Sequence, residues 1–405
     1  MQFYKHSELA DQYHVSLKTV HNWISGAKDK KINLQLHEAK SGIYVSNTAE
    51  NTIMLESLAE KGKKYRNQVH HKIIHPTPEF YDIYNDRQIF DIINNLNIYR
   101  EVPRQYNYFA KGAENWDKWL QKLAKETAPN LLTGTVELLH HNMGSIDRLI
   151  EKDTRVNVID LGVGNALPAK ELLDHLLSKG VLHRYIAIDI SEKMLSIAEE
   201  NVKTWFKGKV KFEKYIRDFT HQRFDDLIGD DMLDKQAEKS VNIVLLFGAT
   251  PNNFRSFTSA FSVAYGSMSK DDLLIYTAKL DTEASRRYFD FSSDPNQSIR
   301  PGISSLAQSH RYLLDLMNIS DDLYTVESGF DEKKFMRYIR IRLRTSVTIE
   351  FQNGKILRKV NLERGDTLLM LRYWHQSAQE IVSIFEGIGF IMLHSNITND
   401  RQFIL

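Results

Sequence analysis

The chain of 405 residues contains no cysteine. This absence excludes disulfides, thiolate nucleophiles, thiolate metal ligands and iron–sulfur clusters. The chain also lacks a run of about 18 apolar residues and a signal-peptide core after Met1, so we expect a cytoplasmic protein without a membrane partner. Its net charge of +1 gives no overall attraction to a polyanion. The length predicts two or three domains.

The most informative segment is an apolar stretch that ends in an acid and two glycines. Val158 and Ile159 precede Asp160, Gly162 and Gly164. About 25 residues later, a second apolar run starts at Tyr185 and ends at Asp189. This spacing is typical of a βαβ unit whose glycines approach a nucleotide and whose second acid reaches a ribose. An NAD site is disfavoured because Leu167 occupies the position of the third glycine in that motif.

Strand-like and helix-like segments alternate around this motif. Strands are predicted at 156–161, 185–190, 210–215, 241–247 and 273–277, with helices such as 168–178 and 193–204 between them. This order predicts an α/β fold with a parallel, doubly wound sheet. Beyond it we expect a helix over 282–317, a strand over 334–343, a hairpin over 347–357 with its turn at Asn353-Gly354, a helix over 377–386, and strands over 390–393 and 402–405.

Residues 1–70 are expected to form a separate small domain. Helices over 7–13 and 17–24, a hairpin of strands 31–36 and 42–45, and a helix over 49–62 follow one another. The segment resembles the winged helix-turn-helix of MerR-like and excisionase-like DNA-binding domains. Residues 1–78 hold 11 Lys and Arg against 7 Asp and Glu, an excess of 11 − 7 = +4. A DNA partner and a protein partner both stay open; the candidate DNA-binding residues are Lys18, Thr19, His21 and Asn22.

Two prolines in 71–78 indicate a linker, and helices are predicted from Glu79 to about Glu151. Histidines at 70, 71 and 75 have no carboxylate at ligand spacing, so we expect no metal site.

Residues 106–405 resemble the class I S-adenosylmethionine-dependent methyltransferases, and within them the histidine Nα-methyltransferase family of ergothioneine synthesis. The resemblance implies a Rossmann-like sheet with an inserted α+β substrate lobe, and S-adenosylmethionine as cofactor. It implies that the glycines admit the methionine part of the cofactor, that Asp189 holds the ribose hydroxyls, and that Asp218 and Phe219 frame the adenine. The implied cofactor-binding residues are Asp160, Gly162, Gly164, Lys170, Asp189, Ile190, Asp218, Phe219, Phe247 and Gly248.

The same resemblance implies a substrate site. Asn253, in the loop that follows the strand at 241–247, matches a residue that holds the amino-acid end of the substrate. Tyr108 matches a residue at the mouth of the substrate site, and Tyr288 matches a substrate-contacting tyrosine more loosely. Family members that bind histidine carry Glu and Ser ahead of a Lys-Tyr pair. Here Arg372-Tyr373 follows four apolar residues, 368–371, which argues against histidine as the substrate.

The expected domains are the winged helix-turn-helix at 1–70, the linker at 71–78, a helical capping segment at 79–150, the methyltransferase core at 151–278, an inserted lobe at 279–372 and a terminal part of the core at 373–405. The leading hypothesis is N-methylation of an amino acid or a similar small molecule, with no general base assigned. One alternative is a cofactor-sensing DNA-binding regulator with little catalysis. A DNA-base methyltransferase is a weaker alternative, because the order Pro251-Asn252-Asn253-Phe254 does not fit a flipped base.

Overall fold

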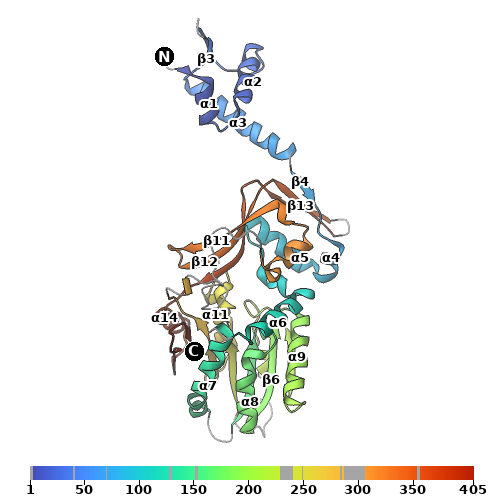
Figure 1. Cartoon of the computed structure of the whole chain (residues 1–405), viewed down its shortest axis with the longest axis vertical. Coiled ribbons are helices and arrows are strands. Elements are labelled where there is room, and N and C mark those ends of the chain that lie inside the picture. The colour runs from blue at the N-terminus through green and yellow to red at the C-terminus, as the bar shows by residue number, and fades with distance from the viewer. Residues whose placement is uncertain are drawn as a thin grey trace. The chain divides into compact units, whose positions relative to one another are not determined.

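The structure is a computed structural model of the whole chain (Figure 1). It describes residues 3–39, 42–69, 71–126, 130–150, 154–228, 240–248, 250–282, 285–286, 306–353 and 356–405. The chain divides into two compact units. Unit 1 comprises Met1–Ile73 and Thr345–Thr348, and unit 2 comprises Ile74–Arg344 and Ile349–Leu405.

Unit 1 contains two short helices, a small antiparallel sheet and a long helix (Figure 1). The elements are α1 (His6–Gln12), α2 (Leu17–Lys28), β1 (Phe3–Tyr4), β2 (Leu36–Ala39), β3 (Gly42–Ser46) and α3 (Ala49–Val69), with strand order β1-β3-β2. The hydroxyl of Ser16 caps α2 by accepting the backbone N–H of Thr19 at 3.2 Å. Leu9, Val20, Val45 and Leu55 are fully buried and form the shared core.

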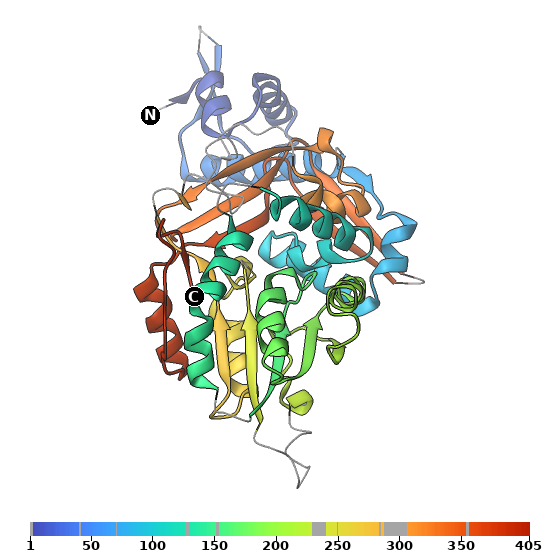
Figure 2. The same cartoon turned by 60° about the horizontal axis from the view of Figure 1, so that its bottom comes forward.

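Unit 2 is built on a parallel sheet with helices on both faces (Figure 2). The described strands run in the order β7 (Phe212–Ile216), β6 (Leu182–Asp189), β5 (Arg155–Leu161), β8 (Ser240–Leu246) and β9 (Leu273–Tyr276). One face packs against α7 (Leu131–Leu149), α8 (Lys170–Ser178) and α9 (Glu192–Phe206), and the other against α10 (Asp225–Ile228), α11 (Thr258–Ser267) and α14 (Ala378–Ile388). The expected parallel, doubly wound sheet is therefore confirmed.

The two faces follow from the two-residue alternation of the strands. In β5, Val158 packs with the cluster that contains α8, whereas Ile159 packs with the cluster that contains α11. Because both faces are covered, the strands read as continuous apolar runs. The antiparallel end is β16 (Phe403–Ile404), which pairs with β10 (Ala278–Lys279).

A helical segment precedes the sheet. It contains α4 (Pro78–Ile83), α5 (Asp86–Asn94), the π-helix η1 (Asn95–Tyr99), the 3₁₀ helix η2 (Arg104–Tyr108) and α6 (Lys111–Leu123). After the sheet come α13 (Gln308–Leu316), β11 (Tyr324–Asp331), β12 (Met336–Leu343), β13 (Val347–Asn353), β14 (Ile356–Leu362) and β15 (Thr367–Trp374). These strands form two groups: β11-β12-β15, which is antiparallel, and β14-β13-β4, where β4 is Lys72–Ile74.

Several sequence-based expectations differ from the structure. The strand expected at 31–36 is β2 at Leu36–Ala39, because the amides of Lys31 and Ile32 donate to the Gly26 carbonyl and close α2 instead. The strand expected at 390–393 is absent from this described segment, where Ile391 is 82 % exposed and Gly389 ends α14 with φ +120°. The segment expected as a linker contains β4. Gly354, in the expected hairpin turn, lies outside the described residues.

Candidate active site

The loop after β5 has a backbone that favours glycine. Gly162 and Gly164 have φ of +72° and +56°. The amide of Gly162 donates to the carbonyl of Ile188 at 2.8 Å, which ties the loop to β6. A Cβ at Gly162 would lie 3.3 Å from the ring of Phe219. The glycine loop and the loop after β7 therefore meet at the carboxyl edge of the sheet, where open α/β folds bind ligands.

Asp189 ends β6 beside this loop. Its Oδ1 accepts the amide of Ser191 at 2.9 Å, and the amides of Gly164 and Ile190 also favour its ionised form. Asp189 is only 9 % exposed, and burial raises its pKa to about 6 against these hydrogen bonds. The structure thus brings Gly162, Gly164, Asp189 and Ile190 together as one group.

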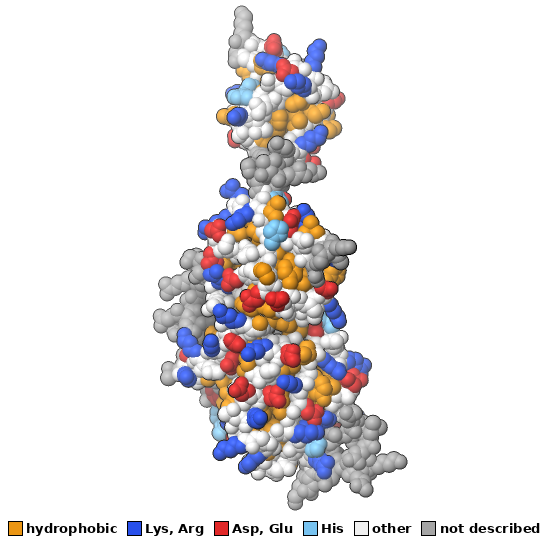
Figure 3. Space-filling view, turned by 90° about the vertical axis from the view of Figure 1, so that its right-hand side faces the viewer, with side chains coloured by type: hydrophobic (Ala, Val, Ile, Leu, Met, Phe, Trp, Pro, Cys, Tyr) orange, Lys and Arg blue, Asp and Glu red, His pale blue; other side chains and the backbone are white. Residues whose placement is uncertain are grey.

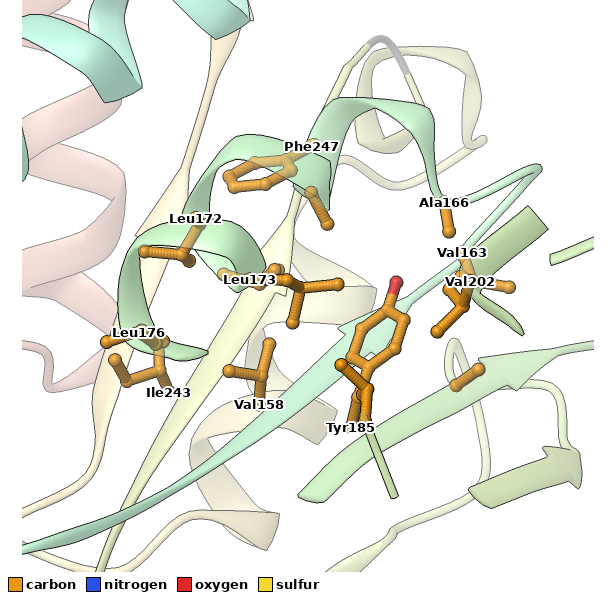
Figure 4. Close-up of a cluster of buried hydrophobic side chains, with 14 of the residues drawn as sticks. Val158, Val163, Ala166, Leu172, Leu173, Leu176, Tyr185, Val202, Ile243 and Phe247 are labelled. Carbon is orange, nitrogen blue, oxygen red and sulfur yellow. The ribbon is translucent and has the colours of Figure 1, made fainter. Parts of the chain in front are cut away.

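Asp160 lies deeper in the same group. The hydroxyl of Tyr185 donates to its Oδ2 at 2.6 Å. Burial raises the pKa of Asp160 to about 7; the Tyr185 hydrogen bond opposes that shift, and the charge of Asp189 adds to it. Figure 4 shows the ring of Tyr185 among Val158, Val163 and Val202, with its hydroxyl pointing toward the loop that carries Val163 and Ala166.

Asp218 and Phe219 lie in the loop after β7. The amide of Arg217 donates to the Asp189 carbonyl at 3.0 Å, so this loop is joined to the end of β6. The carboxylate of Asp218 accepts the amide of Thr220 at 3.0 Å, and its backbone N–H donates to Gln222 Oε1 at 2.8 Å. Phe219 is buried next to Gly162, with its ring 5.9 Å from that of Phe254.

The loop after β8 contributes the next group. The ring of Phe247 packs in the core near Leu172 and Leu173 (Figure 4), and Gly248 donates its amide to Thr277 Oγ1 at 3.3 Å. In the 3₁₀ helix η5 (Pro251–Asn253), Asn252 is fully buried, whereas Asn253 is half-buried. Of the two asparagines, Asn253 is therefore the more accessible to a ligand.

Tyr108 ends η2 and connects the helical segment to the sheet edge. Its carbonyl accepts the Ser191 hydroxyl at 2.7 Å, two residues after Asp189. Its own hydroxyl accepts Arg104 Nε–H at 2.6 Å, and its ring lies 5.4 Å from Trp116. The structure thus places Tyr108 beside the cofactor candidates, although they are far apart in sequence.

Other candidates are not part of this group. The ammonium of Lys170 lies 3.7 Å from Asp174 and 6.0 Å from the ring centroid of Phe206, so its cofactor role stays a prediction. Tyr288 lies outside the described residues. Lys18, His21 and Asn22 are exposed on α2 of unit 1, whereas the Thr19 hydroxyl is 2.9 Å from that of Ser16.

Sequence reasoning missed five residues at this edge. A Cβ at Gly164 would lie 3.6 Å from Trp116 Nε1, and the buried Asn165 donates to Asp117 at 2.7 Å. Tyr185 and Arg104 are the partners of Asp160 and Tyr108 described above. The Trp116–Trp119 aromatic pair was visible in the sequence, but its contact with the glycine loop depends on tertiary packing.

The parallel sheet with this carboxyl edge is the fold of a class I S-adenosylmethionine-dependent methyltransferase. A sequence model of the family described as histidine-specific, S-adenosylmethionine-dependent methyltransferases matches residues 86–405. Because the match covers most of the chain, the chain belongs to this family, and its cofactor is S-adenosylmethionine. The matched range leaves out nearly all of unit 1, so the comparison gives no support to a winged helix-turn-helix there.

Solved structures show similarity at low identity. One is an S-adenosylmethionine-dependent methyltransferase from Clostridium acetobutylicum, with 13 % identity, a TM-score of 0.36, and coverage of 73 % of this chain and 95 % of that one. Another is phosphoethanolamine N-methyltransferase 2 from Haemonchus contortus bound to S-adenosyl-L-methionine, with 13 % identity, a TM-score of 0.30, and coverage of 65 % and 39 %. No curated protein matches the chain.

Among the described residues, no helix is long and apolar enough to cross a membrane. In the same part of the chain, no group of three or more His, Asp and Glu side chains is arranged to hold a metal ion.

Proposed function

We propose that this methyltransferase N-methylates an amino acid or a similar small molecule. The observation that carries this proposal is the junction of Tyr108 with the end of β6, through the Ser191 hydroxyl. Tyr108 is a candidate substrate-binding residue, and Ser191 also bonds to Asp189, the candidate for holding the ribose. Asn253, from the loop after β8, would hold the amino-acid end of the acceptor.

The residues present fit the cofactor. A buried carboxylate at the end of β6 can accept two ribose hydroxyls, and Phe219 can cover one face of the adenine. Bound S-adenosylmethionine supplies an electrophilic methyl group on a positively charged sulfur. The acceptor nitrogen forms the new N–C bond as the S–C bond breaks, and the nitrogen then loses its proton to solvent. Tyr108 and Asn253 would act by holding the nitrogen about 3 to 3.5 Å from the methyl carbon.

The strand that would contact the acceptor's side chain is apolar. Leu368 and Met370 on β15 are 0 % and 3 % exposed, in the apolar stretch ahead of Arg372-Tyr373, where the resemblance implies Glu and Ser in histidine-binding relatives. The part of β15 that precedes Arg372 carries no carboxylate that could bind an imidazole. We therefore expect amino acids with apolar side chains to be better acceptors than histidine.

The test is an acceptor panel with mass-spectrometric detection of methylated product. We expect turnover with apolar amino acids, weaker turnover with histidine, and none with the N-acetylated counterparts, whose nitrogen is not nucleophilic. Asn253→Ala should raise KM for the acceptor about tenfold, the effect of losing one or two hydrogen bonds. Ser256→Ala, at an exposed position three residues after Asn253, is the control. Methylation of N-acetylated compounds at the same rate would contradict the proposal.

A second proposal concerns unit 1. Lys18 and Asn22 are exposed on α2, which begins after a four-residue break from α1, and an antiparallel β2–β3 pair follows. This arrangement supports the hypothesis that unit 1 is a winged helix-turn-helix that binds DNA. The hypothesis predicts salt-dependent binding to duplex DNA that Lys18→Ala together with Asn22→Ala weakens. If the double variant and the wild type bind alike, a protein partner is the better interpretation.

A further inference from the structure

Arg337 on β12 is a buried cation for which the described residues provide no acidic partner. It is only 6 % exposed. Burial lowers its pKa, and no carboxylate of the described residues acts against that shift. Its Nε has no hydrogen-bond partner in the described part of the chain. The ring of Phe330, 5.8 Å from the guanidinium carbon, is a weaker compensation than an ion pair would be.

Two acids of the same lobe, Asp281 and Glu332, are engaged by Arg286. Both oxygens of Asp281 accept from Arg286, at 2.8 Å and 2.6 Å, and Glu332 lies 3.8 Å from the same guanidinium. Burial lowers the pKa of His375 to about 4, so this side chain is neutral at pH 7. Lys279, 2 % exposed, is a further cation that acts on His375, as Arg337 does. The described residues around Arg337 therefore do not neutralise its charge.

Arg337 is connected to the loop that carries Asn253 through the neighbouring strand β15. It is directly opposite Tyr373 in the β12–β15 pair, so their side chains share a face of the sheet. The next residue, Trp374, holds the loop through two bonds: its carbonyl accepts Asn252 Nδ2 at 2.8 Å, and its indole N–H donates to the Phe254 carbonyl at 2.7 Å. On the face of Arg337, the Tyr373 hydroxyl donates to the carbonyl of Lys279. Lys279 lies two residues after Thr277, whose side-chain oxygen accepts the amide of Gly248.

A buried charge without a partner is costly, and the cost is removed when a ligand supplies the opposite charge. We infer that Arg337 binds an oxyanion, a carboxylate or phosphate group, of the methyl acceptor. The inference rests on the proposed function, because the group bound would be the α-carboxylate of an amino-acid acceptor or the phosphate of a similar small molecule. A guanidinium offers two parallel N–H donors to such a group, and the apolar ring of Phe330 lies beside it.

The experiment is thermal unfolding of the full chain with saturating S-adenosylhomocysteine, in sodium acetate, sodium phosphate or sodium chloride at equal ionic strength. Acetate, phosphate or both should raise Tm by about 2 °C or more over chloride, as expected for a ligand that binds only the folded state. The anion that acts shows which oxyanion the site takes. Arg337→Met should remove the shift without lowering Tm in chloride, because it deletes an unpaired charge. Arg337→Lys should keep part of the shift, because its ammonium retains the charge without the paired N–H donors.

Arg340→Met is the matched control on the same strand. Arg340 donates to Glu327 at 2.7 Å, so its charge is already paired, and this variant should keep the full anion shift. The inference is overturned if neither anion stabilises the wild type, if Arg337→Met retains the shift, or if Arg337→Met loses several degrees in chloride, which would indicate a partner within the chain. Calorimetric titration of the same samples with S-adenosylhomocysteine distinguishes a failure of the anion site from a failure of the proposed function. The cofactor site can be intact while the anion response is absent.

Discussion

At the scale of single residues, the site concentrates buried carboxyl groups. Asp160 and Asp189 have pKa values raised to about 7 and about 6, and desolvation is the largest cause for both. Such shifts mark groups whose ionised form is destabilised until a ligand compensates it. The two acids therefore link cofactor binding to pH.

Cofactor binding should weaken in acid. Asp189 must be ionised to accept two ribose hydroxyls, and its pKa of about 6 means that the acceptor form is lost as pH falls below 6. The affinity for S-adenosylhomocysteine should fall by up to about tenfold per pH unit there, as expected for one linked proton. Calorimetry between pH 5 and 8 measures this slope. Asp189→Asn should bind weakly and without the slope; an unchanged profile in that variant would remove Asp189 from the ribose role.

Asp160 should make the free protein less stable at high pH. Its pKa in the folded state lies above the value of about 3.9 for an unfolded chain, so the folded state binds the extra proton. The unfolding free energy should therefore fall as pH rises from about 4 to about 7, and level off above. At pH 8, Asp160→Asn should raise the unfolding free energy by on the order of 2 kcal/mol. Asp174→Asn, in an exposed ion pair, is the control, and equal changes in both variants would contradict the assignment.

We expect Gly162 to be needed both for its positive φ and for its close approach to the ring of Phe219. Gly162→Ala places a Cβ 3.3 Å from Phe219 at a φ of +72°, whereas Gly180→Ala meets the same strain at +74° with no atom within 4 Å. Each variant should lose about 1 kcal/mol of stability. Only Gly162→Ala should lower the affinity for S-adenosylhomocysteine, by about tenfold or more, in calorimetric titration. Equal affinities for the two variants would show that the glycine loop does not contact the cofactor.

At the scale of elements, the pattern of apolar residues predicted the strands that are buried along most of their length. The strands β5, β6 and β8 are covered on both faces, so their sequences carry a strong signal. The same reasoning was wrong for 390–393, since an apolar run without a partner strand does not form a sheet. The π-helix η1 could not be predicted, because a turn with one extra residue has no distinct composition or apolar spacing in the sequence.

Removing residues 1–70 should leave the cofactor site intact. The matched family range begins at residue 86, and β4, which pairs with β13, begins at Lys72. The truncated chain should bind S-adenosylhomocysteine within about twofold of the full chain, a change near measurement error. Deleting residues 1–77 also removes β4 and should lower Tm in a thermal scan. A large loss of cofactor affinity in the shorter truncation would show that unit 1 contributes to the site.

At the scale of the whole molecule, charges of both signs are interspersed over the surface, as the face in Figure 3 shows, in keeping with a net charge of +1. The net charge therefore provides no overall attraction to a charged ligand, and the anion site proposed at Arg337 would act locally. Local sequence predicted Gly162, Gly164 and Asp189, because strand ends and glycine spacing are local signals. Trp116 and Arg104 could not be found this way, since their contacts arise only when the helical segment packs on the sheet edge.

The most direct test of the central claim is a crystal structure of the full chain with S-adenosylhomocysteine. The account predicts the ribose hydroxyls within hydrogen-bonding distance of the Asp189 carboxylate, the homocysteine part against Gly162 and Gly164, and the adenine beside Phe219. A ligand that binds in solution but occupies another part of the molecule in the crystal would contradict it.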